Sequence, residues 1–88
     1  MEFQEDKVQN FLDLFQQIKS TIRTFEGCSH LELKRDLRKP NVFYTVSKWE
    51  DNKYLEMYRD SEFFEDTWSK TKILFAATPK AYSLVDID

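Results

Sequence analysis

The spacing of apolar residues changes at Gly27, the only glycine of the 88-residue chain. Before it, apolar side chains recur every three or four positions, which predicts an amphipathic helix that Asp6 caps and that ends near Thr24. After it, Leu31 and Leu33 alternate with polar residues, as in a strand with one buried face. We therefore expect a helix and then a strand, with Gly27 in the turn because that turn needs a positive φ.

The rest of the chain predicts a hairpin, two more helices and a last strand. Residues 42–49 are rich in β-branched and aromatic side chains and are expected to pair with the first strand after a polar connection. A short helix is expected over residues 50–60, and Ser61 is placed to cap a longer helix that ends at residues 77–80, where a proline occurs. Apolar and polar side chains alternate over residues 81–87, which predicts the last strand there.

This order of elements lacks one strand of a ferredoxin-like β-α-β-β-α-β domain, whose sheet would be antiparallel. Only Met1–Phe3 precede the first helix, and three residues are too few for a central strand. We therefore expect the first strand to be truncated or missing in this chain, so that it continues before Met1 or a neighbouring chain fills its place. The predicted fold class is α+β, in a single domain over residues 1–88.

Composition limits the partners of this domain. Hydrophobic residues make up 41% of the chain and aromatic residues 16%, enough for one small core. A chain of this size buries only about 60–65% of its unfolded surface, so an interface with a second copy is expected to add stability. The net charge is −3, without the basic stripe that nucleic acid or an anionic membrane requires. No apolar run approaches the roughly 20 residues of a membrane span, and the cytoplasm is the expected location.

Cys28 and His30 are the only cysteine and the only histidine, two residue types that often carry nucleophilic, acid–base or metal chemistry. One cysteine and one histidine two positions apart on a strand do not match the ligand set of a structural zinc site. The Cys28 side chain is expected to be buried and to pack as a small hydrophobic residue. By alternation Cys28 and His30 share the face opposite Leu31, which lies away from the helices and toward a partner sheet. A slip of one residue in register would turn His30 toward a pocket instead, so both placements stay open.

Four segments of the chain carry a family resemblance: FEGCSHLELKRD (Phe25–Asp36), PNVFYTVSKWED (Pro40–Asp51), LEMYRDSEFF (Leu55–Phe64) and PKAYSL (Pro79–Leu84). In this order and at these spacings they resemble the antibiotic biosynthesis monooxygenase family, over nearly the whole chain. The resemblance implies a ferredoxin-like α+β protomer that pairs sheet to sheet with a second copy into a dimeric α+β barrel. It also implies a pocket for a small apolar or aromatic molecule between sheet and helices.

For the monooxygenase branch, the resemblance implies oxygenation of a small aromatic or polyketide-like compound without metal, flavin or heme. A deprotonated phenolic substrate can itself reduce dioxygen, so the protein needs an apolar pocket, a proton acceptor and hydrogen bonds to the anion. On spacing alone the aromatic residues are more typical of a core, and the resemblance is what favours a pocket. The candidate catalytic residues are His30, Tyr58 and Trp68, and the candidate pocket-lining residues are Trp49, Tyr44, Phe64 and Tyr82.

The family also includes a heme-degrading branch, which the residues disfavour. Trp68 stands at the position of its iron-binding histidine, and an indole N–H cannot ligate iron. Tyr58 matches its pocket tryptophan, and its strand asparagine would fall before Met1. No cofactor and no metal site are therefore expected. The alternative to an enzyme is a non-catalytic dimeric protein of the same fold that binds a small ligand.

Overall fold

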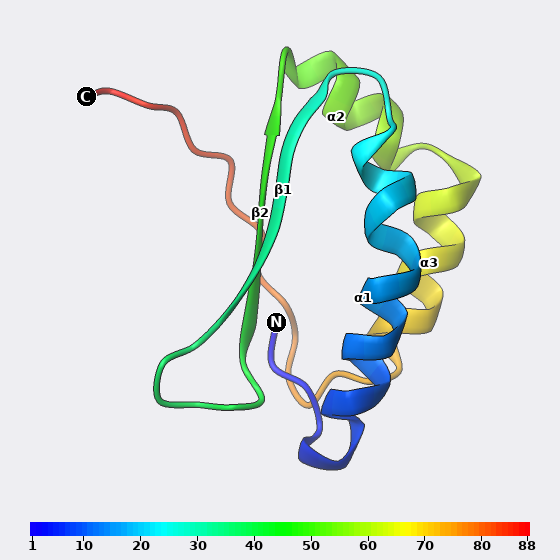
Figure 1. The fold of residues 1–88 in the computed structure, drawn as a ribbon, viewed down its shortest axis with the longest axis vertical. Helices are drawn as coiled ribbons and strands as arrows, with labels where there is room; N and C mark the ends of the chain where they lie inside the picture. Colours follow the sequence, from blue (N-terminus) through cyan, green and yellow to red (C-terminus); the bar gives the residue numbers. More distant parts are fainter.

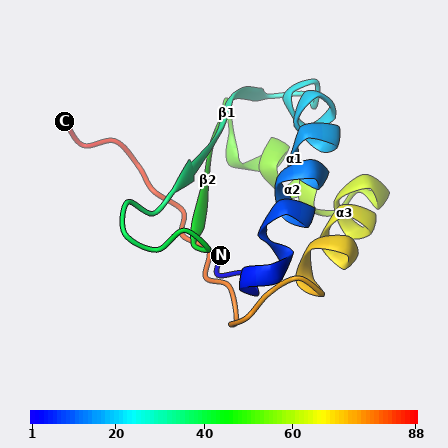
Figure 2. The ribbon, with the colours of Figure 1, turned by 60° about the horizontal axis from the view of Figure 1, so that its bottom comes forward.

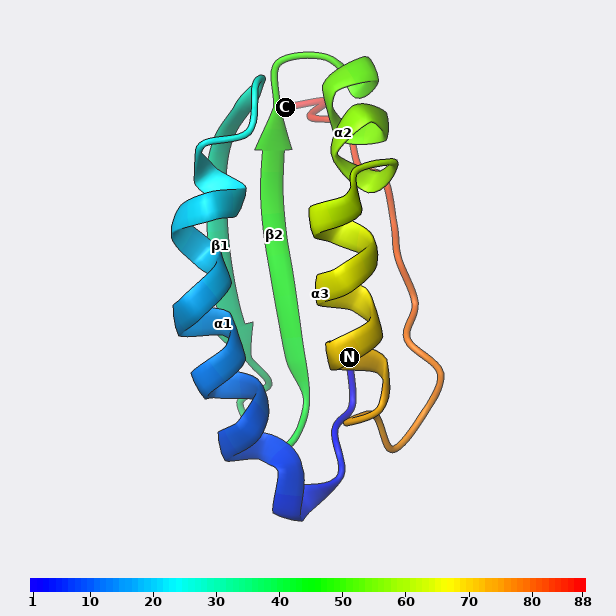
Figure 3. The same ribbon diagram turned by 90° about the vertical axis from the view of Figure 1, so that its right-hand side faces the viewer.

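A two-stranded antiparallel sheet lies against three α-helices in the computed structural model, which describes residues 1–88 (Figure 1). The elements are, in chain order, the 3-10 turn Glu5–Lys7, α1 (Val8–Arg23), β1 (Cys28–Arg35), β2 (Phe43–Trp49), α2 (Asn52–Arg59) and α3 (Glu62–Lys72). Helices α1 and α3 run side by side along one face of the hairpin, and no helix covers the other face (Figure 3). The chain is thus a two-layer α+β domain, as the sequence predicts.

Helix α1 has the expected amphipathic character, and its buried side chains are Phe11, Phe15 and Ile22. The prediction that Asp6 caps it is wrong, because Asp6 lies within the 3-10 turn that precedes the helix. The helix ends as predicted, with Thr24 as its C-cap, and Gly27 has a φ of 83°. A Cβ atom at Gly27 would also collide with the Tyr54 ring. The turn therefore requires glycine for its backbone conformation and for the close approach of a side chain.

The hairpin confirms the predicted strand pair, with Leu31 opposite Ser47 and buried against the helices. The register shifts between Cys28 and His30, so β1 carries one extra residue there, a β-bulge. His30 lies on the face away from the helices, which is the face that alternation predicts. Cys28 lies opposite Trp49 on the helix side, and the prediction that Cys28 shares a face with His30 is wrong because the bulge interrupts the alternation.

Met1–Phe3 occupy the central position expected for the first strand. The Phe43 N–H donates to the Met1 carbonyl over 2.8 Å on one side. The Ala76 N–H donates to the Glu2 carbonyl over 2.8 Å on the other. Phe3 is fully buried, stacks on Phe11 with ring centroids 4.1 Å apart, and packs between the two flanking segments. This pairing with β2 ends at Phe43, so the later residues of β2 have no strand on that side.

Ser61 caps α3 as predicted, and its hydroxyl oxygen accepts from the Phe64 N–H over 3.1 Å. Helix α3 ends at Lys72, before the predicted end at residues 77–80. The predicted last strand over residues 81–87 is wrong, because this segment pairs with no strand edge and has no regular structure. It runs past the open edge of β2 and projects from the body of the protein (Figures 1 and 2). None of the helices has the length and apolar character needed to cross a membrane.

Candidate small-molecule site

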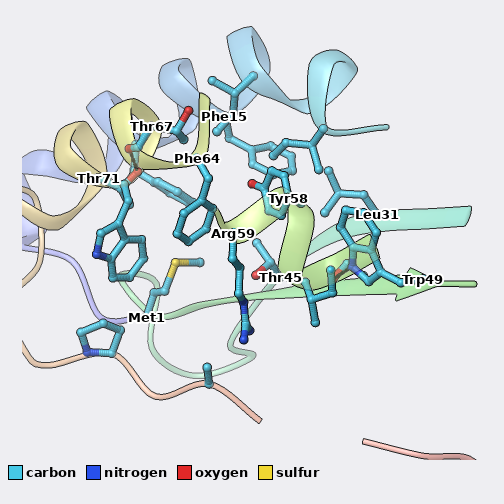
Figure 4. A pocket seen from close by; sticks show the side chains of 18 of the residues that line it. Met1, Phe15, Leu31, Thr45, Trp49, Tyr58, Arg59, Phe64, Thr67 and Thr71 are labelled. Carbon is cyan, nitrogen blue, oxygen red and sulfur yellow. Dashed lines mark hydrogen bonds between the residues drawn. The ribbon is translucent and has the colours of Figure 1, made fainter. Parts of the chain in front are cut away.

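A cavity of about 470 Å³ lies between the helices and β2 (Figure 4). Its walls come from the helices α1, α2 and α3, from both strands, and from the start of the C-terminal tail. Most of the lining side chains are hydrophobic, including Phe15, Ile18 and Leu31. Small-molecule sites in proteins have volumes of roughly 300–1,000 Å³ and walls of this character. The cavity is therefore suited to a small, largely apolar molecule.

Four aromatic side chains form a continuous row along this cavity. The ring centroids of Trp49 and Tyr58 are 5.3 Å apart, and those of Tyr58 and Phe64 are 5.1 Å apart. Phe64 and Trp68 stack with their planes 7° apart, because residues four apart on α3 lie on the same face of the helix. The row offers ring faces and edges to a flat ligand, which is how aromatic molecules are bound in proteins.

Tyr58 brings a hydroxyl group into this aromatic row. Burial raises the pKa of Tyr58 to about 12, and the nearby Cys28 thiol adds to the rise while the Arg59 guanidinium opposes it. Because the pKa is so high, the hydroxyl stays protonated near neutral pH and acts as a hydrogen-bond donor rather than as a base. The position of Tyr58 is fixed at the end of α2, where its carbonyl accepts from the Ser61 hydroxyl over 2.6 Å.

The charged residues of the cavity wall are cations. Arg59 and Lys80 line the cavity, whereas no Asp, Glu, His or Cys does. The Arg59 side chain extends from the end of α2 toward Thr45 on β2 (Figure 4). Further hydroxyl groups come from Thr45, Ser47, Thr67 and Thr71. A wall with aromatic rings, hydroxyls and cations but no carboxylate favours an aromatic ligand that carries negative charge.

The candidate residues from the sequence divide between this cavity and the opposite face of the sheet. Trp49, Tyr58, Phe64 and Trp68 line the cavity. His30 lies on the opposite face, partly exposed, with its Nε2 3.6 Å from a carboxylate oxygen of Glu32. Tyr44 lies on that face as well and is 52% exposed. Tyr82 lines a second cavity of about 690 Å³, between β2 and the tail. No group of three or more His, Cys, Asp or Glu side chains is placed to hold a metal ion.

Three residues of the cavity carry too weak a sequence signal to be predicted. Arg59 ends a short polar helix, where an arginine is usually solvated, and only its position directly after Tyr58 connects it to the site. Thr45 and Ser47 belong to a strand whose pattern does not say which face is buried. Their assignment to the helix side follows from Phe43, which is 2% exposed and lies on the same face two residues earlier.

The fold is a small two-layer α+β domain with a cavity between its helices and its sheet. Residues 1–69 match the sequence model of the antibiotic biosynthesis monooxygenase family, and the chain belongs to this family. The crystal structure of a conserved protein from Methanosarcina mazei Go1 is similar, with a TM-score of 0.83 and 19% identity over 88% of this chain and 76% of that one. No curated protein matches the chain significantly.

Two further crystal structures share the fold. One, of an antibiotic biosynthesis monooxygenase, has a TM-score of 0.80 and 17% identity, over 88% of this chain and 81% of that one. The other, of a candidate antibiotic biosynthesis monooxygenase from Deinococcus radiodurans, has a TM-score of 0.80 and 15% identity, over 99% of this chain and 91% of that one. At these identities the similarity establishes the ferredoxin-like α+β fold and leaves the reaction to be argued from the site.

Proposed function

We propose that this protein binds the anion of a small, electron-rich aromatic compound in the cavity between α3 and β2 and catalyses its oxygenation by dioxygen. Membership of the antibiotic biosynthesis monooxygenase family supports the type of reaction. The observation that carries the proposal is the cavity wall, which combines an aromatic row with Tyr58 and Arg59 and contains no carboxylate.

The proposed reaction needs no electrons from outside the substrate. In an anthrone-type compound, a CH₂ group becomes a carbonyl group, one atom of O₂ enters the product, and the other leaves as water. The electrons come from the substrate anion, which forms when the substrate loses an acidic proton. Because no carboxylate or imidazole lines the cavity, this proton passes to solvent, and the protein acts by stabilising the anion that remains.

Tyr58 and Arg59 have different roles in this proposal. The Tyr58 hydroxyl, protonated because its pKa is raised to about 12, donates a hydrogen bond to the oxyanion of the substrate. The Arg59 guanidinium supplies positive charge at the cavity wall. Trp49, Phe64 and Trp68 hold the aromatic rings of the substrate and exclude water from the anion.

A second candidate function is a non-catalytic dimeric protein that binds the same class of ligand. It is favoured by the absence of any His, Asp or Glu from the cavity wall, since a proton acceptor is part of most oxygenation mechanisms. The two candidates share the ligand site and differ in whether oxygen is consumed. We also infer a homodimer, which the exposed sheet face around Tyr44 supports.

Oxygen uptake with a panel of anthrones, phenols and quinols tests the proposal. We expect at least one compound to be oxidised with one O₂ consumed per molecule, and Tyr58→Phe to lower the rate by about 100-fold, the effect of removing an oxyanion donor. The matched control is Tyr44→Phe, the same change on the opposite face, which should leave the rate unchanged. We expect His30→Ala to leave it unchanged too. Binding without oxygen uptake would support the second candidate, and neither binding nor uptake would contradict both.

A further inference from the structure

The buried face of α3 carries a threonine, Thr67, whose hydroxyl group has no hydrogen-bond partner. Thr67 is only 8% exposed, yet its hydroxyl takes part in none of the hydrogen bonds of the structure. The other hydroxyl side chains of α3, Ser69 and Thr71, each donate to the carbonyl four residues earlier, over 2.9 and 2.8 Å. This bond is the usual way in which a helix satisfies a serine or a threonine in its interior. Thr67 is thus the exception on its helix.

The Thr67 hydroxyl borders the cavity between the helices and β2. Every side-chain oxygen or nitrogen that is fully shielded from solvent has a hydrogen-bond partner, so the unpartnered oxygen of Thr67 is reached by solvent. Thr67 is one of the residues that line the cavity, together with Phe64 and Trp68 of the same helix (Figure 4). The hydroxyl is therefore open to a molecule that occupies the cavity.

The surroundings of Thr67 do not explain why this position carries a hydroxyl. Helix α1, which packs against α3, contributes Phe11 and Phe15 to the same cavity wall. A hydroxyl group beside apolar side chains gives up bonds to water, and this is costly unless another polar group replaces them. Valine has nearly the same shape as threonine and would fill the position without this cost. Packing alone therefore does not require the hydroxyl.

Thr67 and Tyr58 both lie next to Phe64. The ring centroids of Tyr58 and Phe64 are 5.1 Å apart. Residues three apart on a helix have Cβ atoms about 5–6 Å apart on the same side, which places Thr67 beside Phe64. A flat ligand that lies against the Phe64 ring is thus within reach of the Tyr58 hydroxyl at one edge and of the Thr67 hydroxyl at another.

We propose that Thr67 determines specificity in this site, by a hydrogen bond to a second hydroxyl group of the aromatic ligand, away from the oxyanion that Tyr58 binds. A hydroxyl is the group that fits, because the Thr67 hydroxyl is free both to donate and to accept, and a ligand hydroxyl does the same in return. The preferred ligand therefore carries hydroxyl groups on two different rings. This inference rests on the ligand site of the proposed function but not on oxygenation, since it concerns binding alone.

Calorimetric titration in the absence of oxygen tests the inference. The probes are β-naphthol and the dihydroxynaphthalenes that carry a second hydroxyl on the other ring, and argon protects them from oxidation. We expect the wild-type chain to bind at least one diol about five-fold more tightly than β-naphthol, the effect of one hydrogen bond. Thr67→Val and Thr67→Ala should each abolish this preference, whereas Thr67→Ser, which keeps the hydroxyl, should retain it. The control is Ser69→Ala, at an exposed hydroxyl of the same helix outside the cavity wall, and it should retain the preference as well.

The preference is a ratio of two affinities of one variant, so a general weakening of the fold does not imitate its loss. Equal affinity of the wild-type chain for β-naphthol and for every diol would overturn the role of Thr67 and leave the ligand site intact. A preference that survives in Thr67→Val and Thr67→Ala would place the contact elsewhere in the cavity and overturn it too. No binding of any of these compounds would contradict the proposed ligand site together with this inference.

Discussion

Replacing Phe3 with alanine tests whether the first residues of the chain occupy a central place in the core. The Phe3 side chain is 0% exposed, and its ring lies 4.1 Å from that of Phe11, 5.1 Å from that of Phe75 and 6.0 Å from that of Phe43, between centroids. Truncation of a buried phenylalanine to alanine costs about 3–5 kcal/mol, and three ring contacts favour the upper half of that range. We therefore expect a loss of about 4 kcal/mol.

This loss is large for so small a domain. A chain of 88 residues has a free energy of unfolding of about 4–13 kcal/mol at 0.05–0.15 kcal/mol per residue. For a urea m-value of about 1–2 kcal/mol/M, the midpoint of unfolding falls by about 2–4 M, measured by circular dichroism. Phe3→Leu keeps the site apolar and should cost less than about 1.5 kcal/mol, which keeps the effect measurable if Phe3→Ala does not fold. A cost for Phe3→Ala below 1 kcal/mol, like that expected at exposed Leu37, would refute the central placement.

Three other changes test local features of the fold. Gly27→Ala should destabilise by about 2–3 kcal/mol, from the positive φ and the collision with the Cβ and ring of Tyr54. In a Tyr54→Gly background, measured against the Tyr54→Gly single variant, the cost in urea unfolding should fall to about 1 kcal/mol, the part that comes from the positive φ. The pKa of Tyr58 is raised to about 12 in the folded state, so the folded protein holds this proton more tightly than the unfolded chain does. The free energy of unfolding that this difference contributes is complete below pH 10 and is lost as the pH rises from 10 to 12. Because Tyr58 is partly exposed, we expect this loss to be about 1 kcal/mol. Tyr58→Phe should remove this loss in alkaline unfolding curves. The N–H groups of Arg38 and Lys39 lower the pKa of Asp36, so its contribution is present above about pH 4 and is lost at lower pH. In Asp36→Asn, the free energy of unfolding should therefore fall less steeply below about pH 4 than in the wild-type chain. An equally steep fall in the variant would contradict the contribution of the Asp36 carboxylate to stability.

Local patterns determine the parts of the fold that sequence could predict. The apolar spacing in α1, the positive φ of Gly27 and the cap at Ser61 each depend on a few neighbouring residues, and the structure confirms them. The last strand could not be predicted in the same way. Residues 81–87 alternate, but a strand also needs an edge to pair with, and that edge lies elsewhere in the fold. The bulge beside Cys28 likewise depends on how two strands meet, and one extra residue reverses the face of a side chain.

The candidate site was predictable where large side chains carried the signal. Trp49, Tyr58 and Trp68 were expected in a pocket from their residue types and the family resemblance, and they line one cavity. Arg59 was not predictable, because an arginine on a polar helix has no periodicity that indicates which way it points. His30 drew attention as the only histidine of the chain, but the hairpin register carries it to the other face of the sheet.

The indole N–H signals of the two tryptophans give the most direct test of the ligand site. The chain contains only Trp49 and Trp68, and both line the cavity, so an amide-correlation NMR spectrum has two indole resonances and both report on it. On titration with an anthrone or a naphthol, we expect both resonances to shift and to saturate together, while the backbone amides of His30 and Tyr44 stay in place. Shifts confined to His30 and Tyr44, with both indole signals unmoved, would place the ligand on the opposite face and contradict the site.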